Sequence, residues 1–245
     1  LGVMGFHSFL QKNSIPFESV MSKVWNEKIF KHIQSDVDKA SKKLAEERGS
    51  CPDAEEYGFK ERFSNKTAIA PTASISIICG GASPGVEPIA ANSYTHKTLS
   101  GSYNVRNRYL KNILEKYEKN NDEIWSSITT NQGSVKHLDF LSKDEKDVFK
   151  TAFELNQKWI IELGADRTPY ISQAQSINIF LPADVHKKEL HQIHFQAWKK
   201  GLKSLYYCRS KSIQRAENIN NELSTKTINK EISEESNYEE CLSCQ

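Results

Sequence analysis

Ser176-Ile177-Asn178-Ile179-Phe180-Leu181 alternates polar and apolar residues, as a β-strand does. Apolar residues then recur at helical spacing over 188–201, and a second β-like run extends from Leu202 to Tyr207. A strand, a helix and a second strand in this order are typical of parallel pairing. The stretch therefore predicts an α/β architecture.

The segments before this stretch follow the same alternation. The run Thr67-Ala68-Ile69-Ala70 predicts a strand that Pro71 stops, with a loop after it. Apolar residues at helical spacing predict further helices, which span 20–48, 109–117 and 144–163. Gly49 is the C-cap candidate of the first of these helices.

The composition is that of an ordinary globular protein. A chain of 245 residues can form one large domain or two small ones around a substantial core. Lys and Arg number 33 against 31 Asp and Glu, so a formal charge of +2 does not favour nucleic acid or an acidic membrane surface. No apolar run approaches the roughly 20 residues of a membrane-spanning helix, and no signal peptide is evident. We expect a cytoplasmic protein with neither nucleic acid nor membrane as a partner.

Two positions indicate boundaries. Leu1 lies directly inside an apolar stretch, which looks like a cut through a larger polypeptide. At about Ser210 the composition changes, because from there to Gln245 four basic residues face seven acidic ones among abundant Asn, Ser, Glu and Thr. Little apolar surface remains there to pack against a core. The sequence predicts a globular part at 1–209 and a flexible tail at 210–245.

The segment Pro71-Thr72-Ala73-Ser74-Ile75-Ser76 carries three hydroxyls and a series of backbone N–H groups just after a strand. This is the arrangement that an anionic phosphate needs. A Ser/Thr-rich helix cap is the alternative, and the short segment alone favours that alternative. The glycine-rich turn at 80–88, which carries the single carboxylate Glu87, is by itself only a loop.

Tyr206 and Tyr207, the tyrosine pair, end an apolar run. Adjacent tyrosines are usually packing residues, and in a regular strand they point to opposite faces. A redox role would require the two rings to lie close together. The spacing alone does not decide between these roles.

Five cysteines are spread along the chain, and only Cys241 and Cys244 are close in sequence. An odd, dispersed set favours reduced thiols over a disulfide framework. The Cys-x-x-Cys pair is compatible with half a zinc site, a metal-trafficking motif or a redox dithiol, but structural zinc needs four ligands and no second such pair exists. A mobile dithiol is therefore favoured. A flexible arm from Ser210 would give it a reach on the order of 30 Å.

Taken in order, these residues resemble the C-terminal half of the class I ribonucleotide reductase large subunit over 1–209. The ordered set carries the resemblance rather than any single motif. Its motifs are Leu1-Gly2-Val3-Met4-Gly5, Leu44-Ala45-Glu46-Glu47-Arg48-Gly49, Pro71-Thr72-Ala73-Ser74, Val86-Glu87-Pro88, Leu99-Ser100-Gly101, Gln173-Ala174-Gln175-Ser176-Ile177-Asn178, and Trp198-Lys199-Lys200-Gly201-Leu202-Lys203 before Tyr206-Tyr207. The fold that this family implies is the C-terminal half of a ten-stranded α/β barrel, followed by the tail.

The resemblance also implies roles for individual residues. The substrate diphosphate would bind to Thr72, Ala73, Ser74, Ile75 and Ser76. The tyrosine pair would be the last links of a radical-transfer path from the small subunit. Cys241 and Cys244 would re-reduce an active-site disulfide and would themselves be reduced by thioredoxin or glutaredoxin. No catalytic role is implied for the other cysteines, which are Cys51, Cys79 and Cys208.

The implied activity is that of a ribonucleoside-diphosphate reductase, which converts ribonucleoside diphosphates to deoxyribonucleoside diphosphates by radical chemistry. In this family the radical cysteine and the sites for nucleotide effectors lie upstream of Leu1, and the metal-radical cofactor belongs to the small subunit. We therefore expect the chain to bind no cofactor, to need the N-terminal remainder of the large subunit, and to form a homodimer when complete. The alternative is a non-catalytic phosphate-binding module with a metal-binding or docking Cys-x-x-Cys tail.

Overall fold

The computed structural model describes residues 1–98 and 101–210. The predicted tail lies outside the described residues beyond Ser210, and so do Cys241 and Cys244. The helices are, in chain order, α1 (Phe6–Lys12), α2 (Val20–Arg48), α3 (Pro52–Glu56), α4 (Ala73–Ile78), α5 (Arg108–Lys116), α6 (Asp122–Thr130), α7 (Lys143–Val148), α8 (Gln157–Arg167), the 3-10 turn η1 (Thr168–Tyr170) and α9 (Lys187–Lys199).

Four extended segments lie side by side in parallel. β3 (Ile179–Leu181) pairs with β4 (Cys208–Ser210), and α9 connects the two strands. On the other side of the β3 segment, Gln175 forms an isolated parallel bridge with Ile69. The Ala68 N–H in turn donates to the Leu1 carbonyl at 3.0 Å. The parallel α/β arrangement that the sequence predicted is therefore confirmed.

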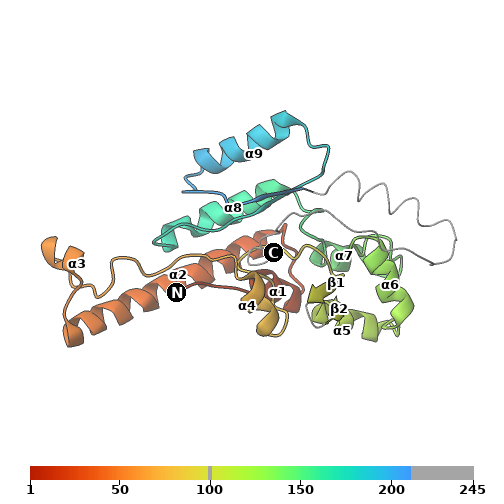
Figure 1. The fold of residues 1–245 in the computed structure, drawn as a ribbon, viewed down its shortest axis with the longest axis horizontal. Helices are drawn as coiled ribbons and strands as arrows, with labels where there is room; N and C mark the ends of the chain where they lie inside the picture. The colour runs from red at the N-terminus through yellow and green to blue at the C-terminus, as the bar shows by residue number, and fades with distance from the viewer. Residues whose placement is uncertain (99–100, 211–245) are drawn as a thin grey trace.

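α2, α8 and α9 cover one side of these segments. α8 lies between α2 and α9 (Figure 1). The core that they share is apolar and includes Phe30, Ile161, Ile177, Ile179 and Ile193. α2 begins where the Ser19 hydroxyl oxygen accepts the Ser22 N–H at 3.1 Å, and it ends at Gly49, whose φ of +83° suits glycine. Both ends agree with the sequence prediction.

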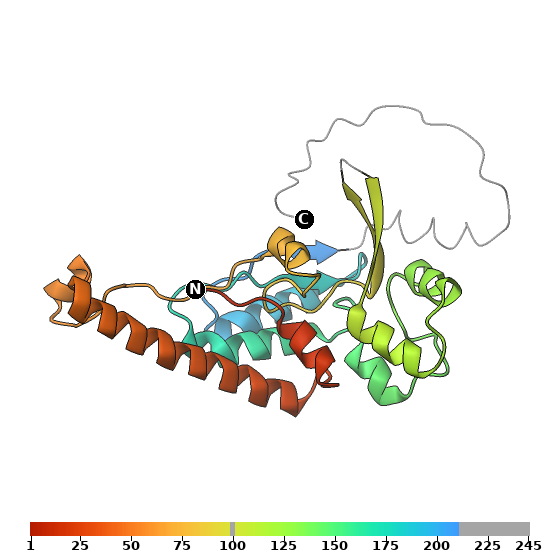
Figure 2. The ribbon, with the colours of Figure 1, turned by 90° about the horizontal axis from the view of Figure 1, so that it is seen from below.

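A second group of elements packs around a core of its own. β1 (Ser93–Thr98) and β2 (Gly101–Arg106) form an antiparallel hairpin that projects away from the body (Figure 2). Beyond it, α5, α6 and α7 enclose an apolar cluster that includes Leu110, Leu114, Trp125, Ile128 and Val148. The helix predicted over 109–117 is confirmed as α5, whereas the sequence did not predict the hairpin.

The helix predicted over 144–163 is divided in the structure. α7 and α8 are separated by 149–156, where Phe149, Ala152 and Leu155 remain buried without a helix. The Ala152 N–H donates to the Ile89 carbonyl at 2.8 Å instead of bonding within a helix, and the Asn156 side chain caps α8. Apolar spacing alone could not distinguish a buried connection from a helical face.

Two shorter predictions also need correction. The segment after Pro71 was expected to be a loop, but Ala73 begins α4. The β-like run at 202–207 is not a regular strand, because β4 begins only at Cys208. In the described part of the chain, none of the helices combines the length and the apolar character required to cross a membrane.

Candidate functional site at the tyrosine pair

The site lies directly before the start of β4 (Cys208–Ser210). The Ile179 N–H donates to the Tyr207 carbonyl at 2.9 Å. A regular parallel ladder would continue with the Tyr207 N–H bonded to the Ile177 carbonyl. That carbonyl instead accepts the Tyr206 N–H, at 2.8 Å. Two residues, Tyr206 and Tyr207, thus occupy the place opposite Asn178 that one residue occupies in a regular ladder, and this arrangement is a β-bulge.

The bulge brings the two tyrosine rings together. Their centroids are 4.1 Å apart and the ring planes are inclined by 48°. In a regular strand the two side chains would point to opposite faces. Each side chain is 43% exposed, so the pair is also open to a neighbouring surface. The ring contact that a redox role requires is therefore present, although the role itself stays a prediction.

Asn178 and Glu87 stabilise the bulge through hydrogen bonds. Both side chains are buried. The Glu87 carboxylate accepts the Asn178 backbone N–H at Oε1 (2.8 Å) and the Asn178 amide Nδ2 at Oε2 (3.0 Å). The Asn178 Oδ1 accepts the Tyr207 N–H at 3.0 Å. The N–H that the bulge removes from the ladder therefore has a side-chain partner, as buried backbone groups require.

The Glu87 carboxylate lies in a buried, charged setting. Burial raises the pKa of Glu87, and this effect is only partly offset by the two Asn178 N–H bonds and by the positive charges of Arg209 and Arg167. Burial lowers the pKa of Arg167 to about 9, so this side chain remains a cation at neutral pH. The Arg209 guanidinium also lies over the Tyr207 ring, 5.6 Å from its centroid. The same cation thus acts on both the carboxylate and the ring.

The predicted phosphate segment is joined to this network through the glycine-rich turn at 80–88. The Gly85 N–H donates to the Thr72 Oγ1 at 2.7 Å, two residues before Glu87. The turn is also fixed to α1, because Ser8 and Ser83 exchange N–H to hydroxyl bonds of 3.1 and 2.8 Å. The segment before α4 and the tyrosine pair are therefore attached to the same turn.

The hydroxyls of the predicted phosphate segment differ in their surroundings. Thr72 adopts a left-handed conformation with a φ of +55°, and its Oγ1 already accepts the Gly85 N–H. The Ser76 hydroxyl is buried and donates to the Ala73 carbonyl at 2.8 Å. Of these three residues, Ser74 is the exposed one.

The backbone at the start of α4 also offers donors. The first helical bond runs from the Ser76 N–H to the Thr72 carbonyl at 2.9 Å. Within the ranges that the structure describes, the N–H groups of Ala73, Ser74 and Ile75 have no acceptor, as is usual for a first helical turn. The segment is therefore a helix start whose first N–H groups stay available and that has no side-chain cap from Thr72, and phosphate binding there stays a prediction.

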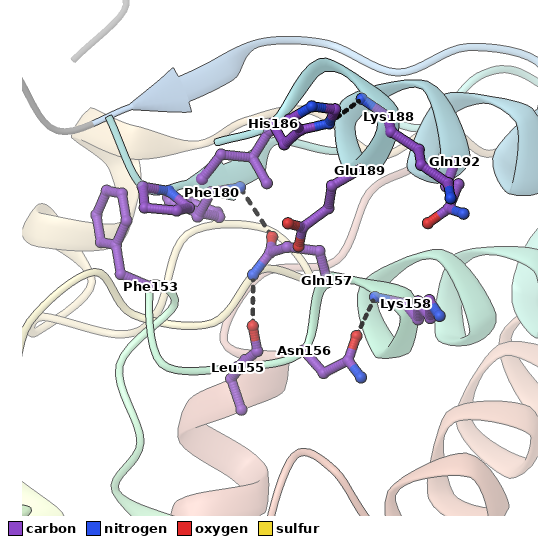
Figure 3. Close-up of a pocket in the computed structure, with 12 residues that line it drawn as sticks. Phe153, Leu155, Asn156, Gln157, Lys158, Phe180, His186, Lys188, Glu189 and Gln192 are labelled. Carbon is purple, nitrogen blue, oxygen red and sulfur yellow. Dashed lines mark hydrogen bonds between the residues drawn. The ribbon is translucent and has the colours of Figure 1, made fainter. Parts of the chain in front are cut away.

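A separate cavity of about 580 Å³ lies between the N-termini of α8 and α9 (Figure 3). Asn156 and His186 cap these helices and accept the N–H groups of Lys158 and Lys188 at 3.0 and 3.1 Å. The cavity is lined by neither the tyrosine pair nor the predicted phosphate segment. It does not form part of the site described above.

The remaining predicted residues are cysteines. Cys51, Cys79 and Cys208 are free thiols. Cys241 and Cys244 lie outside the described residues, so their pairing stays a prediction. Among the side chains that the structure describes, no three His, Cys, Asp or Glu residues gather as ligands for a metal ion.

Sequence reasoning missed the residues that hold the tyrosine pair. Asn178 belongs to the predicted strand at 176–181, and in the sequence Glu87 is only a carboxylate in a turn. Arg209 and Arg167 belong to no motif in the sequence that would single them out. The one available signal was that Glu87 and Asn178 are polar residues within apolar surroundings, which is typical of a pair that satisfies itself by hydrogen bonds.

Comparisons with known proteins agree with this architecture. A family model for the barrel domain of ribonucleotide reductase matches residues 1–62 and 52–208. The ribonucleoside-diphosphate reductase large subunit of Invertebrate iridescent virus 6 is 50% identical over 233 residues, which are 94% of this chain and 24% of that protein. The large subunit of Danio rerio is 31% identical over 242 residues, covering 86% of this chain and 30% of that protein.

A solved structure is also similar. The Actinobacillus ureae class Id ribonucleotide reductase alpha subunit superposes with a TM-score of 0.80 at 40% sequence identity, covering 86% of this chain and 38% of that one. The chain spans between 24% and 38% of the length of these three relatives.

Proposed function

Because this chain belongs to the ribonucleotide reductase barrel family and corresponds to the C-terminal part of the large subunit, we propose that it forms part of the catalytic core of a ribonucleoside-diphosphate reductase. The enzyme would replace the ribose 2′-hydroxyl of a nucleoside diphosphate by hydrogen, with electrons from a dithiol. The relatives named above carry large-subunit names, which support this function and do not support a non-catalytic binding module.

The contact between the tyrosine rings carries the proposal. A tyrosyl radical is reduced by accepting one electron and one proton, and a neighbouring phenol at a centroid distance of 4.1 Å is placed to supply both and to become the radical in turn. Both rings are partly exposed, so a small subunit that supplies the radical can approach them. Tyr206 and Tyr207 would be the last links before the active-site cysteine.

The substrate would bind at the start of α4. The N–H groups of Ala73, Ser74 and Ile75 and the exposed Ser74 hydroxyl are donors suited to a diphosphate. Thr72 would act mainly by holding the glycine-rich turn at 80–88 in place, since its Oγ1 accepts the Gly85 N–H. Ser76 would steady the helix start through its bond to Ala73.

The proposed enzyme needs partners. A small subunit would supply the metal-radical cofactor, and the N-terminal remainder of the large subunit would supply the radical cysteine and the effector sites. Cys241 and Cys244 would carry electrons from thioredoxin or glutaredoxin. The complete large subunit would be a homodimer in the cytoplasm.

The test is to replace Tyr206 and Tyr207 singly by Phe in the large subunit that contains this chain, assembled with its small subunit. Phe keeps the ring packing but has no ionisable hydroxyl, so we expect nucleoside diphosphate reduction to stop while the melting temperature changes little. Tyr57→Phe, at an exposed tyrosine outside the site, is the matched control and should leave turnover unchanged. Near-normal turnover by either variant of the pair would overturn the proposed radical route.

A further inference from the structure

The orientation of the Asn178 amide is fixed by its neighbours. A carboxylate only accepts hydrogen bonds, whereas an amide both donates and accepts. Both Glu87 oxygens are occupied by Asn178 donors, the backbone N–H and the Nδ2. The amide must therefore turn its NH₂ toward Glu87 and its oxygen away from it. That oxygen is the atom that accepts the Tyr207 N–H.

The bulge depends on this acceptor. If the Asn178 amide were turned over, its NH₂ would face the Tyr207 N–H and two donors would oppose each other. The Tyr207 N–H would then lose its partner, and the regular bond to Ile177 is already taken by Tyr206. An unpaired backbone donor favours a change of register, and a return to the regular ladder would direct the two rings to opposite faces. The ring contact is thus coupled to Glu87 through a single amide.

From this hydrogen-bond polarity we infer that Glu87 and Asn178 are positioning residues for radical transfer, which hold the bulge that brings the Tyr206 and Tyr207 rings into contact. Neither side chain would exchange an electron or touch the substrate. The catalytic part of the inference rests on the proposed function, whereas the geometric part does not. Glu87→Gln and Asn178→Asp are the variants that test it, because each changes the hydrogen-bonding polarity with almost no change in volume.

Each single variant introduces a conflict. In E87Q the NH₂ of the new glutamine faces the NH₂ of Asn178, and two donors cannot bond to each other. The Asn178 amide can relieve this conflict by turning over, so that its oxygen faces position 87. In N178D two carboxylates face each other in a buried site. Placing like charges together without solvent is unfavourable. Both changes should break the hydrogen bond from the Tyr207 N–H to residue 178 or displace that N–H.

The double variant E87Q/N178D restores a consistent pattern. The amide oxygen at position 87 accepts the backbone N–H of position 178, and its NH₂ donates to the new carboxylate. The second oxygen of that carboxylate accepts the Tyr207 N–H. One buried carboxyl group is kept near Arg167 and Arg209, as in the natural protein. Rescue by the double variant therefore distinguishes an effect of hydrogen-bond polarity from an effect of side-chain packing.

The experiment uses the large subunit containing this chain, assembled with its small subunit, and measures two quantities. Crystal structures of the variants report the distance between the tyrosine rings, and steady-state kinetics report kcat and KM for a nucleoside diphosphate. We expect both single variants to separate the rings and to lower kcat by about a hundredfold, the loss that a displacement of about 1 Å can cause. KM should not change, because the start of α4 is untouched. The double variant should recover both the ring contact and most of kcat.

Other outcomes are equally informative. Rings that stay in contact in both single variants, or a double variant no better than the worse single one, would overturn the positioning role. If the rings separate and recover as expected but turnover never changes, the positioning role stands and the radical route fails. If the single variants do not fold, the double variant must fold, and its failure would also overturn the inference. Glu145→Gln, at a carboxylate that caps α7, is the control for the loss of a bonded charge elsewhere and should leave kcat unchanged.

Discussion

At the scale of single residues, the tyrosine pair depends on side chains that no sequence motif marks as functional. Asn178 looked like the polar member of an alternating strand, but it is buried together with Ile177 and Ile179 on either side. The alternation predicted a strand with one polar face. The Asn178 amide instead forms hydrogen bonds to the Glu87 carboxylate and the Tyr207 N–H. Patterns of residue type cannot show such pairings, because the partners are 91 and 29 positions away in the chain.

His7 is a residue-scale feature with a measurable consequence for pH dependence. Its side chain is fully buried, and its Nδ1 accepts the Ile89 N–H at 3.0 Å. Burial lowers the pKa of His7 to about 3, and a proton on Nδ1 would also oppose that N–H. The unfolded chain binds this proton at its ordinary pKa near 6.5, so lowering the pH from 6.5 toward 3 favours the unfolded state.

We therefore expect the free energy of unfolding to decrease by about 2 kcal/mol from His7 alone between pH 6.5 and pH 5, at about 1.4 kcal/mol per pH unit. His7→Asn removes the titrating group, so this part of the pH dependence should disappear, although the variant is less stable at pH 7. Urea unfolding of the two proteins at pH 7 and pH 5 measures the difference. An unchanged pH dependence in the variant would show that His7 accepts a proton in the folded state.

At the scale of elements, the sequence predicted helices well where both ends carry signals and poorly where only apolar spacing was available. α2 has the hydroxyl of Ser19 at its start and Gly49 at its end, and both bounds were close to the prediction. The division between α7 and α8 was missed because Ala152 bonds to Ile89, a contact outside the local sequence. The irregular entry into β4 was missed for the same reason.

The start of α4 makes a separate prediction about the substrate. Replacing Ser74 by Ala removes an exposed hydroxyl that would donate to a charged phosphate, and such a bond contributes about 1.5–3 kcal/mol. We expect KM for the nucleoside diphosphate to rise with kcat little changed. Adding Thr72→Ala should raise KM further and also lower stability, because the Gly85 N–H loses its acceptor.

Kinetics and thermal unfolding of the same variants separate these two effects. Ser127→Ala, which removes a hydroxyl bonded to His137 in the lobe of α5 to α7, serves as the control and should leave KM unchanged. A double variant at Thr72 and Ser74 with the natural KM would show that the diphosphate binds elsewhere.

At the scale of the whole molecule, the ordered set of motifs was sufficient to predict the family and the parallel α/β fold. The hairpin formed by β1 and β2 was not predictable from a hydrophobic pattern, because its aromatic residues Tyr94 and Tyr103 are exposed and belong to neither of the two hydrophobic clusters that the structure describes. Apolar side chains are also exposed on α4 and α9, where Ile78 is 83% and Trp198 is 73% accessible. Such surfaces fit a chain that spans only 24% to 38% of its relatives.

This partial coverage leads to a prediction about activity. By family resemblance, the cysteine that abstracts hydrogen from the ribose belongs to the part of the large subunit that precedes these residues. We expect the 245-residue chain mixed with a small subunit to show no reduction of nucleoside diphosphates. Addition of the matching N-terminal part of the large subunit should restore it. Turnover by the chain and the small subunit alone would refute this division of roles.

The last prediction concerns Cys241 and Cys244, which belong to the acidic segment after Ser210. If they form a dithiol that re-reduces the active site, replacing both by Ser in the complete enzyme should abolish repeated turnover with thioredoxin. A single turnover by pre-reduced enzyme should survive, because the active-site dithiol that the resemblance implies would supply the first two electrons. Small dithiols that enter the active site directly should restore part of the activity, since thiol exchange requires only an accessible thiolate. Loss of the single turnover, or tight zinc binding by the natural protein without disulfide formation, would instead assign the pair to a metal or docking role.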